Sequence, residues 1–67
     1  MMTTNPETGV PFRAFLDLAE SQGWTLVKLI GNHRILVQPD RKVRLSVEVL
    51  SGRIDEEDFR ELVQLLF

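Results

Sequence analysis

Residues 24–38 read WTLVKLIGNHRILVQ, and this stretch of the 67-residue chain decides its fold. Two apolar runs flank the dipeptide Gly31-Asn32, and a two-residue loop of this kind between such runs is typical of a β-hairpin. A type II′ turn takes Gly first, because that position needs a positive φ, and it tolerates Asn second. The pattern therefore predicts a hairpin in which Ile30 pairs with His33, the first residue of the returning strand.

A helix is predicted over residues 11–22, before the hairpin. Apolar residues recur there at the spacing that lines one helical face. They are Phe12, Phe15, Leu16 and Ala19. Pro11 suits the first turn of a helix, where its missing N–H costs nothing, and Gly23 suits the end of one in the left-handed conformation.

A third strand and a second helix are predicted after the hairpin. The strand is indicated by apolar residues that alternate with polar ones at Val43, Leu45, Val47 and Val49. The helix is indicated by helical spacing at Phe59, Leu62, Val63 and Leu66. We expect Asp55 to cap it and the acidic residues 56–58 to lie in its first turn, where free N–H groups favour negative charge. Capping explains these carboxylates better than metal binding, because side chains on one turn diverge.

These elements predict an α+β fold of order α-β-β-β-α, a three-stranded antiparallel sheet with both helices packed on one face. We expect residues 1–10 to be a flexible N-terminal lead-in and residues 11–67 to be a single domain. A chain of this size buries only about 60% of its unfolded surface, so its core is small.

The loop after Gln38 decides which way the strand residues face. A three-residue loop at 39–41 pairs Val37 with Val43 and places His33 on the Trp24 face, under the helices; a four-residue loop reverses the faces. In the register of the first hairpin, Lys28 falls on the Trp24 face among apolar residues, which requires a bulge or an edge position. The opposite face then carries Val27, Leu29, Arg34, Leu36, Gln38, Lys42 and Arg44. We expect this face to bind phosphates, a protein partner or a second copy of the chain.

Composition narrows the class of protein. The net charge of −2 argues against a general nucleic-acid binder. The basic residues are nevertheless concentrated in residues 24–53, with six Lys or Arg against two Asp or Glu, whereas residues 54–67 have five acidic residues against one Arg. The absence of cysteine excludes disulfides and a thiol nucleophile. Because no apolar run approaches about 20 residues and no signal-peptide pattern is present, we expect a cytoplasmic protein without a membrane partner.

His33 is the one histidine of the chain and the main candidate for chemistry. No nucleophile elbow, P-loop, dinucleotide fingerprint or paired-histidine metal motif is present. An imidazole, whose unperturbed pKa is about 6.5, can move a proton in RNA cleavage while Lys28, Arg34 or Arg44 binds the phosphate, with no metal or cofactor. The alternative is an inert histidine at the rim of the core, packed beside Ile30 and Val47.

The order of motifs resembles the HicA (YcfA-like) toxins over residues 11–67. Gly23-Trp24 is similar to the family's Gly-aromatic entry to a strand, Gly31-Asn32-His33 to its Gly-Ser-His motif, and Pro39-Asp40 to the turn that follows. The resemblance implies a fold like that of a small double-stranded-RNA-binding domain, cleavage of messenger RNA by the histidine, and silencing by a HicB antitoxin. It assigns catalysis to His33, with Gly31 and Asn32 as the turn that presents it.

The chain departs from the family pattern at two places. Asn32 replaces the usual serine. Where many members have a Pro-x-His segment after the third strand, residues 48–51 read EVLS. The chain is also acidic, whereas members of the family are typically basic.

Two functions are therefore predicted. The first is a HicA-like toxin of a type II toxin–antitoxin pair, a metal-independent endonuclease that acts on mRNA and is bound by a HicB-like antitoxin protein. Its catalytic residue is His33, and its RNA-binding residues are Lys28, Asn32, Arg34, Lys42 and Arg44. The alternative is a catalytically silent HicA-fold module that forms a homodimer or binds a partner. It would use either the acidic last helix or the sheet residues Val27, Leu29 and Leu36.

Overall fold

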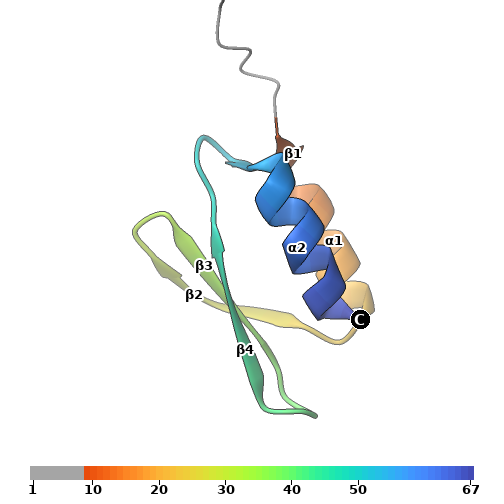
Figure 1. Ribbon diagram of the computed structural model, residues 1–67. Helices are drawn as coiled ribbons and strands as arrows, with labels where there is room; N and C mark the ends of the chain where they lie inside the picture. The colour runs from red at the N-terminus through yellow and green to blue at the C-terminus, as the bar shows by residue number, and fades with distance from the viewer. Residues whose placement is uncertain (1–8) are drawn as a thin grey trace, which may run out of the picture.

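The computed structural model describes residues 9–67 and has the predicted α-β-β-β-α order, with one short strand added before the first helix and one before the last helix (Figure 1). The elements are β1 (Val10–Pro11), α1 (Phe12–Ser21), β2 (Thr25–Ile30), β3 (His33–Gln38), β4 (Val43–Glu48), β5 (Arg53–Ile54) and α2 (Glu56–Leu66). Strands β2, β3 and β4 form an antiparallel sheet in that order, and β1 pairs with β5. The α+β prediction is confirmed.

The folded domain begins before residue 11. Val10 pairs with Ile54, and the Phe12 N–H donates to the Gly52 carbonyl at 2.9 Å. The prediction of a flexible lead-in over residues 1–10 is therefore wrong at its end, because the backbone there is held by β5. Residues 1–8 of that lead-in lie outside the described residues.

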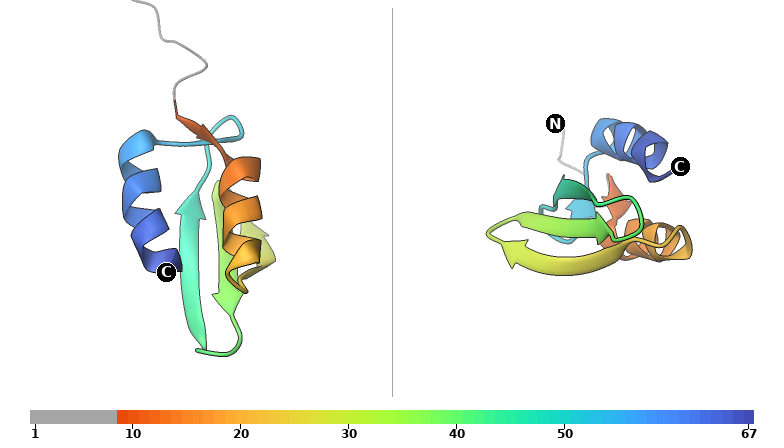
Figure 2. Two further views of the ribbon diagram at one scale, coloured as in Figure 1. Left: turned by 90° about the vertical axis from the view of Figure 1, so that its right-hand side faces the viewer. Right: turned by 90° about the horizontal axis from the view of Figure 1, so that it is seen from below.

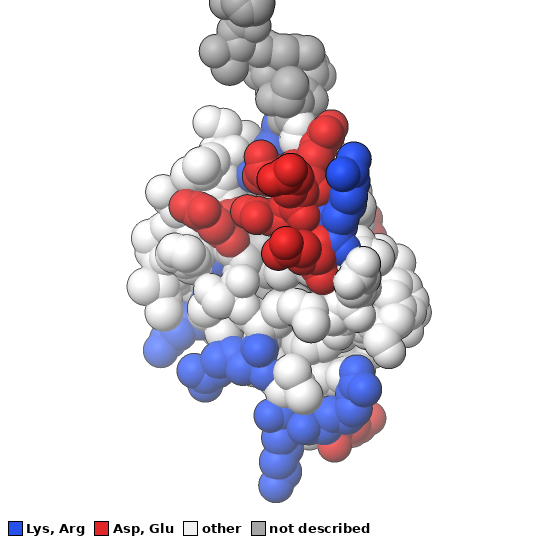
Figure 3. Space-filling view, in the orientation of Figure 1, with Lys and Arg blue, Asp and Glu red and all other residues white. Residues whose placement is uncertain are grey.

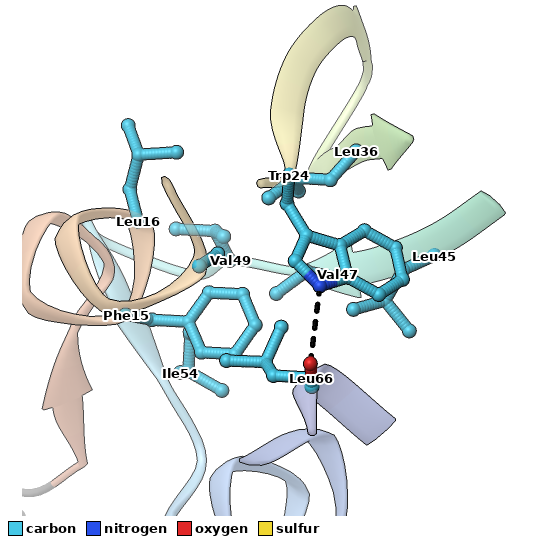
Figure 4. Packing of buried hydrophobic residues seen from close by; sticks show 10 residues of the cluster. Phe15, Leu16, Trp24, Leu36, Leu45, Val47, Val49, Ile54 and Leu66 are labelled. Atoms are coloured by element: carbon cyan, nitrogen blue, oxygen red, sulfur yellow. Dashed lines mark hydrogen bonds between the residues drawn. The ribbon is translucent and has the colours of Figure 1, made fainter. Parts of the chain in front are cut away.

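Gly23 ends α1 as predicted. Its φ is +90°, its N–H donates to Glu20, and the Trp24 N–H donates to Ala19, each at 3.0 Å. This is the Schellman pattern of a helix C-terminus. Pro11 precedes the helix as its N-cap residue and is not in its first turn. The turn delivers Trp24 into the core, where it is 2% exposed and its Nε1–H donates to the Leu66 carbonyl at 3.4 Å (Figure 4).

The β2–β3 hairpin is also confirmed. Gly31 has a φ of +58°, Asn32 has a negative φ, and Ile30 pairs with His33, as a type II′ turn requires. The register of β2 shifts between Leu26 and Lys28. This irregularity is the bulge that was predicted as one way to accommodate Lys28.

The β3–β4 loop has four residues, so the three-residue alternative and its assignment of faces are wrong. Gln38 pairs with Val43, and Lys42 adopts a φ of +56° while its N–H donates to the Gln38 carbonyl at 2.8 Å. This left-handed residue lengthens the loop by one. Leu36 consequently pairs with Leu45 and Arg34 with Val47. His33 lies on the opposite face.

Both helices contribute to one buried cluster against the Leu36 face of the sheet (Figure 4). Its members are Phe15, Leu16, Ala19, Trp24, Leu36, Leu45, Val47, Val49, Ile54 and Leu66. Phe59 of α2 packs edge-on against Phe15, with ring centroids 6.1 Å apart. The left view of Figure 2 shows α2 on one side of β4 and α1 on the other, so α2 is the helix that borders the β4 edge.

Asp55 caps α2 as predicted. Its carboxylate accepts from the N–H groups of Glu57 at 3.0 Å and Asp58 at 3.4 Å. Over residues 9–67, no group of three His, Asp or Glu side chains is placed to hold a metal ion. Glu56, Glu57 and Asp58 lie in the first turn of α2, where the helix dipole favours negative charge.

Candidate active site

His33 lies at the start of β3, exposed on the outer face of the sheet. The expected position under the helices is wrong: the bulge in β2 pairs Leu26 with Leu36, and the four-residue loop pairs Leu36 with Leu45, so Leu36 faces the helices and His33 faces away from them. Of the alternative, a histidine packed beside Ile30 and Val47, the first neighbour is confirmed, because Ile30 pairs with His33, and the second is wrong, because Val47 is fully buried on the other face. The imidazole is thus open to solvent at a rigid turn.

Glu48 is the direct cross-strand neighbour of His33. The Val49 N–H donates to the Asn32 carbonyl at 2.7 Å. A bond between these two flanking residues makes His33 and Glu48 a non-hydrogen-bonded pair, the kind in which Cα atoms are only about 4.5 Å apart and side chains approach closely. Glu48 was not predicted as a neighbour of His33, because a three-residue loop sets Val47 opposite His33.

Ser46 contacts the ring of His33 from the same strand as Glu48. Its Oγ lies 3.5 Å from His33 Nδ1. Within the described part of the chain, Nε2 has no hydrogen-bond partner. Nδ1 therefore lies beside Ser46, while Nε2 is open to a ligand.

These side chains line an open groove of about 270 Å³ between the outer face of the sheet and α2. The lining residues are His33, Ser46, Glu48, Asp58, Glu61, Leu62 and Leu65. The four residues from α2 recur at i, i+3, i+4 and i+7, so one stripe of the helix forms one wall. The groove combines an imidazole with three carboxylates, and no Lys or Arg contributes to its lining.

Lys28 is the predicted cation that lies closest to His33 in the sheet register. It pairs with Ile35, which is two residues beyond His33 on the same face. Diagonal neighbours of this kind lie about 7–8 Å apart, within reach of a long side chain. Arg44 is on the same face opposite Val37, one step farther along the strands.

The other predicted RNA-binding residues are spread over the molecule. Asn32 is exposed in the hairpin turn, and Lys42 is exposed in the β3–β4 loop. Arg34 is not part of the site: it pairs with Val47 on the helix-covered face, and its guanidinium lies 5.5 Å from the centroid of the Phe12 ring. That contact is a cation–π interaction that joins β3 to α1.

The predicted partner surface is only partly exposed. Leu36 is 0% exposed at the centre of the core, so its assignment to that surface is wrong. The physical reason is the combination of the β2 bulge, which pairs Leu26 with Leu36, and the four-residue loop, which pairs Leu36 with Leu45, so that all three face the helices. Val27 and Leu29 on the edge strand are 54% and 63% exposed and remain available for contact.

Charge is divided between the two ends of the molecule. Figure 3 shows most of the visible carboxylates over α2 and most of the visible Lys and Arg side chains toward the β3–β4 loop. Since α2 forms one wall of the groove, its carboxylates repel an anionic ligand, whereas the cations of β2 and of the β3–β4 loop attract it toward their side.

No family model, curated protein or solved structure matches this chain. None of the helices within residues 9–67 has the length and apolar character needed to cross a membrane.

Proposed function

We propose that this protein is a HicA-like RNA endonuclease in which His33 transfers a proton during cleavage of the phosphodiester backbone. The observation that carries the proposal is the position of the imidazole. The ring is exposed at a rigid hairpin, lines an open groove, contacts Ser46 through Nδ1 and has Nε2 without a protein partner in residues 9–67. Lys28 on the same face is the cation we assign to the phosphate.

The proposed reaction is a transesterification that needs no metal. The ribose 2′-hydroxyl loses its proton to a base as its oxygen attacks the adjacent phosphorus, the bond from phosphorus to the 5′-oxygen breaks, and protonated His33 gives its proton to the departing oxygen. The products are a 2′,3′-cyclic phosphate and a 5′-hydroxyl end. A positioned acid of this kind contributes about 10²–10⁴-fold to a rate.

The proposal includes the biological setting that the HicA resemblance implies. The substrate is mRNA, the reaction takes place in the cytoplasm, and the inhibitor is a HicB-like antitoxin protein of a type II toxin–antitoxin pair. An antitoxin that covers the groove would exclude RNA from His33. The carboxylates and leucines of the groove wall favour a partner with basic and apolar side chains there.

A second candidate is a catalytically silent interaction module. Two observations favour it: three carboxylates line the groove, where they oppose RNA, and Val27 and Leu29 expose apolar surface on the edge strand β2. Such a module would form a homodimer or hold a protein partner.

Cleavage of a synthetic single-stranded RNA by the purified protein distinguishes the two candidates. The variants are His33→Ala and, as a matched control, Thr25→Ala, which alters another exposed residue of the same sheet. We expect His33→Ala to lose at least about 100-fold in kcat/KM and Thr25→Ala to retain wild-type activity. We also expect a cyclic-phosphate product and no cleavage of a substrate with 2′-deoxyribose, which has no attacking group.

Circular dichroism establishes that each variant is folded. Induced expression in cells gives a second readout, because the first candidate predicts growth arrest with the wild type and none with His33→Ala. A folded wild type that neither cleaves RNA nor arrests growth refutes the nuclease and favours the silent module. A His33→Ala variant with full activity removes the histidine from the reaction.

A further inference from the structure

We infer that Glu48 is the second catalytic group of this site and accepts the proton of the 2′-hydroxyl while His33 protonates the leaving oxygen. The inference rests on the proposed nuclease function and extends it from one catalytic residue to two. It also gives the carboxylate in the groove a chemical use.

The backbone holds the two groups together. Because His33 and Glu48 form a non-hydrogen-bonded cross-strand pair, their spacing is fixed by the β3–β4 ladder and not by a flexible loop. Both side chains line the same groove, and both are exposed. Ser46, on the same face, contacts Nδ1 of the imidazole and leaves Nε2 available.

The other two carboxylates of the groove are less suited to this role. Asp58 and Glu61 belong to α2, so their distance from His33 depends on how that helix packs. Of the three, Glu48 alone is in register with the imidazole.

The proton and electron balance of the step is complete with these two groups. The Glu48 carboxylate takes the proton from the 2′-hydroxyl as the 2′-oxygen forms its bond to phosphorus. The bond to the 5′-oxygen breaks, and the electron pair of that bond leaves with the oxygen, which takes the proton of the His33 imidazolium. Glu48 then loses its proton and His33 regains one by exchange with water, and no oxidant, reductant or metal takes part.

The test is the dependence of kcat/KM on pH in wild type, Glu48→Gln, Glu61→Gln and Glu20→Gln. Titratable groups that face Glu48 are His33 of β3 and, across the groove, Asp58 and Glu61 of α2; Lys28 of β2 lies on the same sheet face. A carboxylate base must be deprotonated to act, so it makes kcat/KM rise with pH at the acidic end of the profile. An imidazolium acid must be protonated to act, so it makes kcat/KM fall at the basic end. Wild type is therefore expected to give a bell-shaped profile.

Glu48→Gln should lower kcat/KM by about 100-fold or more and remove the rising limb while the falling limb stays. Glu20→Gln makes the same charge change at an exposed residue of α1, and this variant should keep the full wild-type pH profile. The double variant His33→Ala/Glu48→Gln should lose little more than the more severe single variant, because residues that act as a unit are not additive.

Three results would overturn the inference without touching the proposed function. They are a Glu48→Gln variant that keeps the bell shape, a loss of less than about tenfold, and an equal loss in Glu61→Gln, which would indicate a general electrostatic effect of the groove. A wild type without RNase activity instead refutes the proposed function itself. Since Glu48 is exposed, Glu48→Gln should fold like the wild type, and its thermal unfolding curve checks this.

Discussion

Leu36→Ala tests the strand register on which the site depends. Leu36 is 0% exposed on the central strand β3 and belongs to the cluster that both helices cover. The change removes about three buried carbons, each worth about 0.8 kcal/mol, and leaves a cavity that adds to the loss. We expect the free energy of unfolding to fall by about 3–4 kcal/mol, within the range of buried Leu→Ala changes.

The effect should be easy to measure in a chain of this size. Its total stability is expected to be roughly 3–10 kcal/mol, from about 0.05–0.15 kcal/mol per residue, so Leu36→Ala removes a large part of it. At about 4–8 °C per kcal/mol, the melting temperature should fall by more than about 12 °C. Urea unfolding monitored by fluorescence is suitable because Trp24 is the one tryptophan and is buried.

Leu29→Ala is the matched control. Leu29 lies on the edge strand and is 63% exposed, so its truncation should change stability by no more than about 0.5 kcal/mol. If the β3–β4 loop had three residues, Leu36 would face outward and the two variants would behave alike. A loss below about 1 kcal/mol in Leu36→Ala would therefore refute the register, and with it the pairing of His33 with Glu48.

Two further contrasts test other parts of the structure. Lys28→Ala should weaken RNA binding and lower the slope of log affinity against log salt by about 1, as measured by fluorescence anisotropy at several salt concentrations. Arg34→Ala should leave that slope unchanged. It should instead lower the free energy of unfolding by about 0.5–2 kcal/mol in urea, because Arg34 loses its contact with Phe12. Gly9→Ala should destabilise the fold more than Gly31→Ala. Both positions have a positive φ, so an alanine at either one is strained by about 1–2 kcal/mol. A Cβ at Gly9 would in addition lie 2.7 Å from the Ile54 carbonyl oxygen, whereas a Cβ at Gly31 meets nothing within 4 Å. Equal urea midpoints for the two glycine variants would contradict the β1–β5 pairing.

The sequence predicted the features whose causes are local. Gly23 at the end of α1, Gly31 in the hairpin and Asp55 at the start of α2 each act within a few residues, and each was found where expected. The bulge near Lys28 was also signalled, because a lysine among apolar residues conflicts with strict alternation.

The length of the β3–β4 loop had no such signal. Lys42 occupies the left-handed conformation, which is usual for Gly or Asn and not for Lys. One extra loop residue moves every side chain of the returning strand to the other face. The longer loop accounts for the failure to recognise Glu48 beside His33. The wrong positions of Arg34 and Leu36 also depend on the bulge in β2, which pairs Leu26 with Leu36 and so turns the Leu36 face of β3 toward the core.

The distribution of charge constrains how RNA could reach His33. Two carboxylates of α2 form the far wall of the groove, and the cations on the outer sheet face and in its loop are Lys28, Lys42 and Arg44. In water, a pair of charges 4 Å apart interacts by only about 1 kcal/mol, and at physiological salt the field decays over about 8 Å. The local arrangement of charge around a bound phosphate therefore matters more than the net charge of −2. Productive binding would place the scissile phosphate toward β2 and lead the RNA toward the β3–β4 loop, with weak affinity, because the carboxylates of α2 offset part of the attraction.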